Sequence, residues 1–347
     1  MRMIRYPCRS GPWPRSRSTS RPWGVPAAAL LLLAACADEP APEPESSAYN
    51  IDTARISVSG LSSGAHMATQ LHVAHSALFN GAAIISGGPY HCAEGSLNRA
   101  VGPCLEGGDI SVDGLVAAAA DFADKDTIDP IENLADDAVW LFHGALDDVV
   151  NPQLTAATAA FYESLAGSVT FVTDVEAVHG LPTLATGPAC DVFETPFVNA
   201  CDYDAAGRLL ATIYGDLNDR AEAAGELIRV VQPGAADATM LDEAFLYVPA
   251  SCAAGESCGV HVAVHGCTQS SEFVADAFAR GSGFNEWAES NNLLVLYPQV
   301  ASSRFAPMNP YGCWDWWGYT NADYANKAGP QVVVIKNTLD MLAGQEL

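Results

Sequence analysis

Hydrophobic and polar positions along this chain follow two patterns in turn: the alternation that is typical of strands and the spacing that is typical of helices. Runs with the pattern of strands are predicted at 55–59, 81–86, 138–143, 169–173, 226–231, 244–248, 260–264 and 292–297. Helical spacing of apolar residues is predicted over 63–79, 110–123, 153–166, 272–290 and 330–343. Strands that alternate with helices build a mostly parallel sheet with helices on both faces, so we expect an α/β fold.

The chain divides by composition into three predicted parts. Residues 1–35 have the composition of an export signal, residues 36–50 that of a tether, and residues 51–347 that of one large globular domain. No internal repeat and no second linker interrupts the last part. The domain is long enough to bury a core of its own.

The N-terminal segment predicts export. Its first 35 residues carry six arginines and no acidic residue, and the apolar run 25–35 is too short to span a bilayer. The run ends in Leu33-Ala34-Ala35-Cys36, which resembles the bacterial lipobox, so Cys36 is expected to be acylated. An ordinary signal peptide with an incidental cysteine is the alternative. Residues 37–48 are acidic and Pro-rich, which predicts an extended tether that holds the domain off a membrane.

The charge left after the leader is strongly negative. The chain has 16 Lys and Arg residues, of which six lie in the leader. The rest of the chain therefore has ten basic and 41 acidic residues, which give it a formal charge of −31. Such a surface argues against nucleic acid and anionic lipid headgroups as partners. The expected contact with a membrane is therefore the N-terminal lipid alone. The protein is expected at the cell envelope, with secretion as the alternative. The domain is expected to be a monomer.

The cysteines also indicate an oxidising compartment. Cys8 lies in the leader and Cys36 at the lipobox, which leaves eight of the ten cysteines. No Cys-x-x-Cys occurs, so neither a metal site nor a cofactor is expected. Eight cysteines allow 105 connectivities. Pairing in chain order is favoured because short loops close most easily, and it predicts Cys92–Cys104, Cys190–Cys201, Cys252–Cys258 and Cys267–Cys313.

The segment Gly60-Leu61-Ser62-Ser63-Gly64 carries the most specific chemistry. It fits the Gly-x-Ser-x-Gly nucleophile elbow and lies between a predicted strand and a predicted helix. That turn exposes a serine hydroxyl, and the two glycines avoid Cβ clashes. Ser62 is therefore the candidate nucleophile. A plain Gly/Ser turn between two core elements is the structural alternative.

A base and an acid are expected downstream of Ser62, in the order of α/β-hydrolases. Asp147 follows the strand at 138–143, before a helix opened by Pro152, and its spacing favours it over Asp148. His179 lies in a loop beyond the next strand and is the candidate base. The other histidines are interpreted as structural, and His66 as a side chain that could line the site without reaching the hydroxyl.

The developing oxyanion needs two amide donors. One is expected from Ser63, the residue after the nucleophile. The strand-end segment that supplies the other normally precedes the nucleophile, yet here the matching segment, residues 262–269, comes late. The simplest explanation is a circularly permuted α/β-hydrolase whose chain is opened before the nucleophile strand.

Four motifs together closely resemble the single-domain, fungal-type poly(3-hydroxybutyrate) depolymerases. They are residues 60–68, residues 87–92, His265-Gly266-Cys267, and residues 309–319. The resemblance covers roughly residues 51–340. It implies a circularly permuted α/β-hydrolase with the triad Ser62, Asp147 and His179, and an oxyanion hole formed by the amides of Ser63 and Cys267. It also implies Asn309 and Trp314 in the substrate groove.

The resemblance has one departure near the nucleophile. Ala65-His66 stands where the commoner family sequence has Gly-Gly-Tyr, which changes the local pocket and leaves the triad intact. The expected activity is hydrolysis of poly(3-hydroxybutyrate) or its oligomers. A carbohydrate esterase of feruloyl or acetyl-xylan type is the alternative enzyme, and a non-catalytic surface binding lipoprotein is the alternative of another class.

Overall fold

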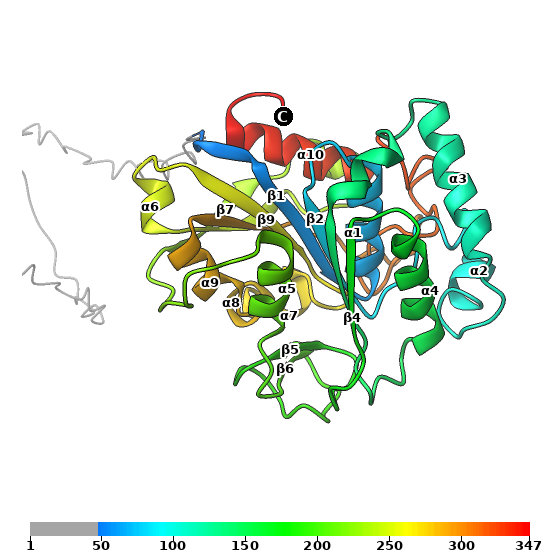
Figure 1. Ribbon diagram of the computed structural model, residues 1–347, viewed down its shortest axis with the longest axis horizontal. Coiled ribbons are helices and arrows are strands. Elements are labelled where there is room, and N and C mark those ends of the chain that lie inside the picture. The colour runs from blue at the N-terminus through cyan, green and yellow to red at the C-terminus, as the bar shows by residue number, and fades with distance from the viewer. Residues whose placement is uncertain (1–47) are drawn as a thin grey trace, which may run out of the picture. The chain divides into compact units, whose positions relative to one another are not determined.

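The computed structural model describes residues 48–347, in which an eight-stranded sheet forms the centre (Figure 1). The strands run in the order β4-β3-β2-β1-β9-β10-β8-β7, parallel from β4 to β10, with β8 antiparallel to both of its neighbours. Their bounds are β1 (Ile51–Leu61), β2 (Gly81–Ile85), β3 (Ala138–Phe142), β4 (Ser168–Val172), β7 (Glu226–Val231), β8 (Glu243–Val248), β9 (Cys258–Val264) and β10 (Leu293–Tyr297).

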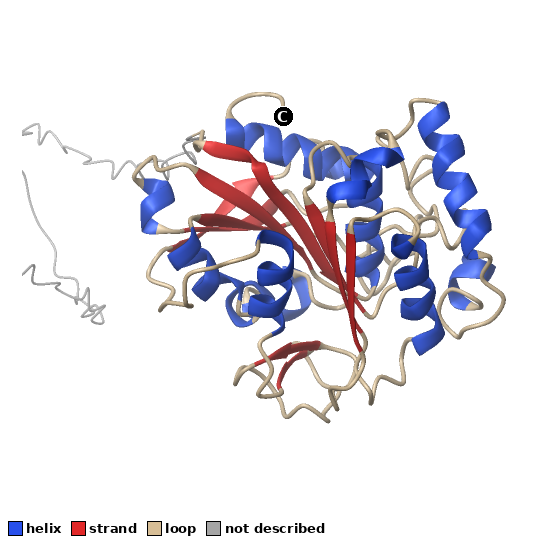
Figure 2. Cartoon of the chain, viewed as in Figure 1, coloured by secondary structure: helices blue, strands red, loops and turns tan. Residues whose placement is uncertain are grey.

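Helices cover both faces of this sheet and enclose one apolar core on each (Figure 2). The first core is built with α1 (Ser63–Ala74), α3 (Val112–Asp124), α4 (Pro152–Glu163) and α10 (Pro330–Ala343). The second is built with α5 (Ala205–Tyr214), α8 (Ala277–Gly281) and α9 (Phe284–Asn291). On β1, Ile56 and Val58 enter the first core and Leu61 enters the second, as the period of two requires.

The predicted strands all occur, and two predicted helices differ from the structure. The helix expected at 63–79 ends at Ala74. The helix expected at 272–290 is three short helices, α7 (Ser271–Val274), α8 and α9, because Ala275 and Gly283 adopt φ values of 51° and 86°. Several short elements and α5 were not predicted. They are α2 (Leu97–Val101), η1 (Ile131–Asp136), β5 (Leu181–Thr183), β6 (Val198–Ala200), η2 (Ala235–Ala238) and α6 (Ala250–Ala253).

The topology is that of a circularly permuted α/β-hydrolase. Strand β9 lies beside β1 in the sheet, although it follows β1 by about two hundred residues in the chain, as the pairing of Ser57 with His261 shows. A chain that began at β7 would reach β9 before β1, which is the order of an α/β-hydrolase. Opening the domain elsewhere is feasible because the first and last parts of the described domain meet: Tyr49 N donates to Leu342 O at 2.7 Å.

Four disulfides join the eight cysteines of the described range. They are Cys92–Cys104, Cys190–Cys201, Cys252–Cys258 and Cys267–Cys313, the pairs expected from chain order. Stable disulfides of this kind form in oxidising compartments, so the protein is an exported one. Within residues 48–347, no helix is both long and apolar enough to cross a bilayer. The predicted signal peptide, the predicted acylation site Cys36 and the predicted tether up to residue 47 lie outside the described residues.

Histidines that the sequence interpretation kept out of the catalytic triad pack inside the domain. His261 lies between β1 side chains, with Nδ1 2.7 Å from Ser57 Oγ and Nε2 2.8 Å from Ser59 Oγ. His72 contacts the Tyr162 hydroxyl and the Asp137 carboxylate. These bonds satisfy buried polar atoms, and they join β9 to β1 and α1 to α4.

Candidate active site

The nucleophile elbow forms at the end of β1. Ser62 has φ 58° and ψ −120°, a strained conformation that lifts its side chain out of the turn. A Cβ on Gly60 would lie 2.0 Å from Gly64 O, and one on Gly64 would lie 2.3 Å from His265 O. Both positions therefore require glycine: the first closes the turn, and the second brings the end of β9 against the start of α1.

The candidate acid and the candidate base lie in the loops that follow β3 and β4. Asp147 Oδ2 lies 2.8 Å from His179 Nδ1, and Asp147 Oδ1 accepts the amides of Val149 and Val150 at 3.0 and 3.1 Å. Asp148 is exposed. A Cβ on Gly144 would lie 2.1 Å from Ala177 O, so this glycine lets the two loops pack closely. The geometry thus pairs His179 with Asp147 and leaves Asp148 at the surface.

Asp147 stays ionised in this setting. Burial by itself would raise its pKa, but the hydrogen bond and the charge of His179, together with the Ser86 hydroxyl and the Val150 amide, lower it to about 2. A buried carboxylate with these partners accepts the Nδ1–H of the imidazole. This fixes the tautomer in which the other ring nitrogen, Nε2, is free to take a proton.

Ser62 and His179 open on the same cavity, which has a volume of about 420 Å³ and a mostly apolar lining. The structure has no direct hydrogen bond between the two side chains, both of which are described. In unliganded hydrolases that bond often tightens only with substrate. Apolar walls are contributed by Leu97, Ala100, Val101, Leu105, Val149, Val150, Phe193, Phe197, Trp316 and Trp317.

The two backbone amides predicted to bind an oxyanion, those of Ser63 and Cys267, are unoccupied among the described residues: neither donates to an acceptor there. The end of β9 is held near the elbow, since a Cβ on Gly266 would lie 3.4 Å from Ser62 Cβ. Gln269 Oε1 accepts the Gly266 amide at 2.6 Å, which holds the peptide that precedes Cys267. The arrangement is suited to stabilise negative charge on an ester oxygen.

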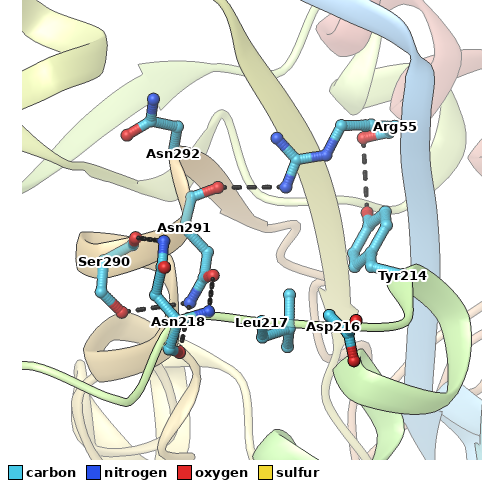
Figure 3. A pocket seen from close by; sticks show the side chains of 8 residues that line it. All are labelled: Arg55, Tyr214, Asp216, Leu217, Asn218, Ser290, Asn291 and Asn292. Carbon is cyan, nitrogen blue, oxygen red and sulfur yellow. Dashed lines mark hydrogen bonds between the residues drawn. The ribbon is translucent and has the colours of Figure 1, made fainter.

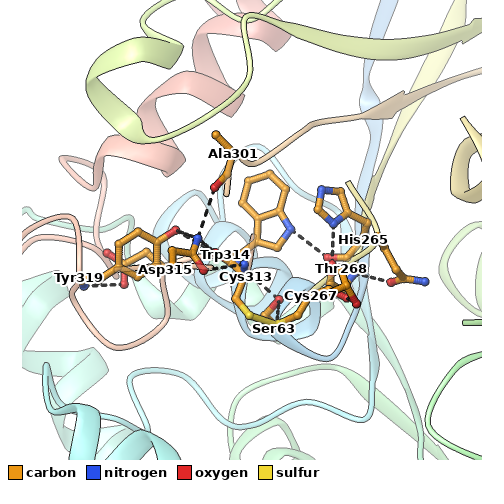
Figure 4. The surroundings of a disulfide bond; sticks show 12 residues. Ser63, His265, Cys267, Thr268, Ala301, Cys313, Trp314, Asp315 and Tyr319 are labelled. Atoms are coloured by element: carbon orange, nitrogen blue, oxygen red, sulfur yellow. Dashed lines mark hydrogen bonds between the residues drawn. A yellow bond between two sulfur atoms is a disulfide. The ribbon is translucent and has the colours of Figure 1, made fainter. Parts of the chain in front are cut away.

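The Cys267–Cys313 disulfide connects this oxyanion loop to the aromatic loop 309–319 (Figure 4). Beside the bond, the Ser63 hydroxyl accepts the Trp314 amide at 3.4 Å, and the Trp314 indole donates to His265 O at 2.9 Å. Asp315 Oδ1 accepts the amides of residues 317–319 and orders the rest of the loop. The loop is therefore joined covalently to the loop after β9 and by a hydrogen bond to the elbow.

Comparison with known proteins agrees with this geometry. The family described as "Esterase PHB depolymerase" matches residues 243–344. A polyhydroxybutyrate depolymerase of Talaromyces funiculosus is 36% identical over 308 residues, which cover 83% of this chain and 89% of the relative. A poly(3-hydroxybutyrate) depolymerase of Delftia acidovorans is 40% identical over 306 residues, 85% of this chain, and the chain spans 61% of that relative's length.

Solved structures are similar as well. The crystal structure of the PHB depolymerase from Penicillium funiculosum superposes with a TM-score of 0.81 at 34% identity, over 86% of this chain and 98% of that one. A PHB depolymerase in complex with an R3HB trimer gives the same TM-score at 32% identity and the same coverage. The chain belongs to the poly(3-hydroxybutyrate) depolymerase family. Members of this family are carboxylic ester hydrolases, and the serine at the elbow fits that class.

In this member of the depolymerase family, two residues expected in the substrate groove lie elsewhere. Trp314 is completely buried, and Asn309 is 2% exposed with its side chain bonded to Cys313 and Tyr319. Neither lines the cavity. The expectation of direct contact was wrong because the aromatic loop turns these side chains inward, where they hold the loop, and it presents Trp316 and Trp317 instead.

The sequence interpretation also missed part of the depolymerase cavity. Phe193 and Phe197 stand in the long segment after His179, with their rings 4.7 Å apart, and Phe193 lies 6.2 Å from the His179 ring. The Cys190–Cys201 disulfide brackets this segment. The exposed Phe193 in a disulfide-closed loop was the available signal, but only the fold shows that the loop returns to the base.

A second cavity, of about 450 Å³, lies away from Ser62 and His179, beside Arg55 in the first half of β1 (Figure 3). Its lining is polar and includes Arg55, Tyr214 and Asn218. These groups are occupied with one another: Arg55 donates to Asn291 O at 3.0 Å, Tyr214 to Arg55 O at 3.3 Å, and Asn218 to Ser290 O at 2.8 Å. We interpret this cavity as a structural junction between β1, α5 and α9.

Proposed function

We propose that this protein is a serine esterase that hydrolyses poly(3-hydroxybutyrate) or 3-hydroxybutyrate oligomers through an acyl-enzyme. One observation carries the proposal: the strained Ser62 opens on the same apolar cavity as His179, which is hydrogen-bonded to the ionised Asp147. The names of the relatives support the same ester class.

The proposed reaction proceeds in two halves. Ser62 Oγ attacks the carbonyl carbon of the ester while His179 Nε2 takes the hydroxyl proton, and the amides of Ser63 and Cys267 stabilise the oxyanion. His179 then returns the proton to the departing alcohol oxygen as the ester bond breaks. A water molecule, deprotonated by the same imidazole, attacks the acyl-enzyme, and the hydroxyacid leaves as Ser62 recovers its proton.

The cavity suits an uncharged, methyl-branched chain. Its walls are aromatic and aliphatic, whereas the domain as a whole is strongly acidic, so apolar contact rather than charge would retain the substrate. Hydrolysis leaves a carboxylate on one product. The negative surface would assist its departure.

Release of 3-hydroxybutyrate from amorphous polymer and from a soluble trimer tests the proposal, with purified full-length protein and a Ser62→Ala control. We expect release that the control abolishes. Hydrolysis of p-nitrophenyl butyrate without release from either substrate would move the activity to another ester, with feruloyl and acetyl-xylan esters next. Failure of Ser62 to react with a fluorophosphonate probe would favour a binding lipoprotein that lacks the chemistry.

We further propose that residues 1–35 are removed, that Cys36 is acylated, and that residues 36–50 tether the catalytic domain 51–347 to a membrane. The lipobox sequence and the acidic, Pro-rich composition of residues 37–48 support this. Mass spectrometry of the mature N-terminus tests it, with Cys36→Ala as the control. A mature chain that begins elsewhere and stays in the aqueous phase would reject the anchor.

A further inference from the structure

His66 is a polar side chain in an apolar cavity and has no hydrogen-bond partner among the described residues. It lies on α1, one helical turn after Ser62, and it lines the cavity that Ser62 opens on. The neighbouring polar groups are occupied: Ser63 accepts the Trp314 amide, Thr268 donates to Cys267 O, and Gln269 holds Gly266. His66 is thus a wall residue with free hydrogen-bonding capacity beside the nucleophile.

The ring of His66 is held in a fixed orientation. It stacks on Trp316 with the ring centroids 4.1 Å apart and the planes 10° from parallel. On another side it packs against Gly88, where an added Cβ would lie 2.4 Å from His66 Cε1. The adjacent Gly87 makes the matching space for Ala65, since a Cβ there would lie 2.3 Å from Ala65 Cβ. The Gly87-Gly88 turn therefore accommodates the Ala65-His66 pair.

The imidazole of His66 carries no charge, and its two nitrogens are not completely enclosed by protein. Buried side-chain nitrogens without a partner in the described range include Nε2 of His75 and of His143, but neither nitrogen of His66. The residue is 7% exposed and lines the cavity. Burial lowers the pKa of His66 to about 3, so the imidazole is neutral and offers one N–H donor and one acceptor.

We propose that His66 is a specificity-determining residue that hydrogen-bonds the oxygen on carbon 3 of the acyl group attached to Ser62. Ser62 and His66 line the same cavity, and His66 lies in the first turn of the helix that begins directly after Ser62, which suits contact with an oxygen a few bonds beyond the reacting carbonyl. A neutral imidazole can accept from a free 3-hydroxyl or donate to an ester oxygen. A plain acyl chain offers neither partner. This inference rests on the proposed function and concerns which acyl group that site selects.

The test compares p-nitrophenyl (R)-3-hydroxybutyrate, its (S) enantiomer and p-nitrophenyl butyrate, with wild-type protein and His66→Phe. Phenylalanine keeps the ring that stacks on Trp316 and removes both nitrogens. The wild type is expected to prefer the hydroxylated ester in kcat/KM and to discriminate between its enantiomers. In His66→Phe, the ratio of hydroxybutyrate to butyrate should fall by about tenfold, the value of one hydrogen bond, and the enantiomer preference should shrink with it.

A second variant tests whether the position of the His66 ring matters when the histidine itself is kept. Gly88→Ala should displace the intact ring and lower the same ratio, with fluorophosphonate labelling of Ser62 showing that the elbow is still folded. Equal losses on butyrate and hydroxybutyrate esters in His66→Phe would overturn the inference and leave His66 as packing for Trp316. Because the esters carry a p-nitrophenyl leaving group, this result is readable even if the protein releases nothing from the polymer.

Discussion

His179 Nδ1 and Asp147 Oδ2 lie 2.8 Å apart, although the residues are 32 positions apart in the chain and lie on different loops. The bond forms because β3 and β4 are parallel neighbours, so that the loops after both strands leave the sheet at the same edge. The next carboxylate, Asp148, points to solvent only one residue away. This contrast gives a matched pair of variants.

Asp147→Asn should lower kcat by about four orders of magnitude, because an amide favours the wrong imidazole tautomer and cannot stabilise the imidazolium. Asp148→Asn removes an equal charge from an exposed position and should keep kcat within about twofold. Steady-state hydrolysis of p-nitrophenyl butyrate measures both. A large loss in Asp148→Asn with a small one in Asp147→Asn would reverse the assignment of the acid.

Removal of the Cys267–Cys313 disulfide by Cys→Ala at both positions should lower kcat by about ten- to a hundredfold. The bond fixes the loop that carries an oxyanion donor, and loss of a whole donor costs about 10²- to 10³-fold. The Cys252–Cys258 pair, which lies at the start of β9, is the control: its removal should cost stability with little loss of kcat per folded molecule. Equal kcat losses in the two variants would show that the first bond has no special role in catalysis.

Two tryptophans of the aromatic loop should differ in what their substitution changes: stability for Trp314 and KM for Trp317. Trp314→Phe should destabilise the domain by about 2–4 kcal/mol, since it leaves a cavity in the core and the carbonyl of His265 without its donor. Trp317→Ala should mainly raise KM for oligomers, about fivefold, because that ring lines the substrate cavity. Urea unfolding and steady-state kinetics on both variants measure the difference. A raised KM in Trp314→Phe but not in Trp317→Ala would contradict this prediction and indicate that Trp314 contacts the substrate.

Acid should weaken the fold well before it titrates Asp147. Burial lowers the pKa of His261 to about 3, and it lowers that of His265 to about 4. Unfolded histidine takes up a proton near pH 6.5, whereas these folded ones stay neutral. Their contribution is therefore complete above about pH 6.5 and is lost as the pH falls toward 3–4, by up to about 1.4 kcal/mol per pH unit for each histidine.

Urea unfolding between pH 7.5 and 5.0 checks this dependence. The wild type should lose stability across that interval, and His261→Asn, although less stable throughout, should show a shallower slope. Asparagine has no titrating group in this range, so the difference in slope reports the histidine alone. Parallel curves for the two proteins would contradict the prediction.

The sequence by itself determined the elements that follow from local pattern. Alternation in β1 and helical spacing in α1 are properties of neighbouring residues, and the Gly60 to Gly64 motif encodes its own turn. The late position of residues 262–269 even predicted the permuted strand order, because an oxyanion segment must lie beside the nucleophile. Chain order likewise gave the four disulfide pairs.

The tertiary structure alone decided which side chains face the cavity. Trp314 and Trp316 are two positions apart in a loop without regular periodicity, so no pattern distinguishes the buried one from the one that meets His66. Phe193 lies beside the His179 ring only through the path of the irregular segment that joins them. Orientation in irregular loops is set by long-range packing and by bonds such as Cys267–Cys313, and a single sequence does not encode those contacts locally.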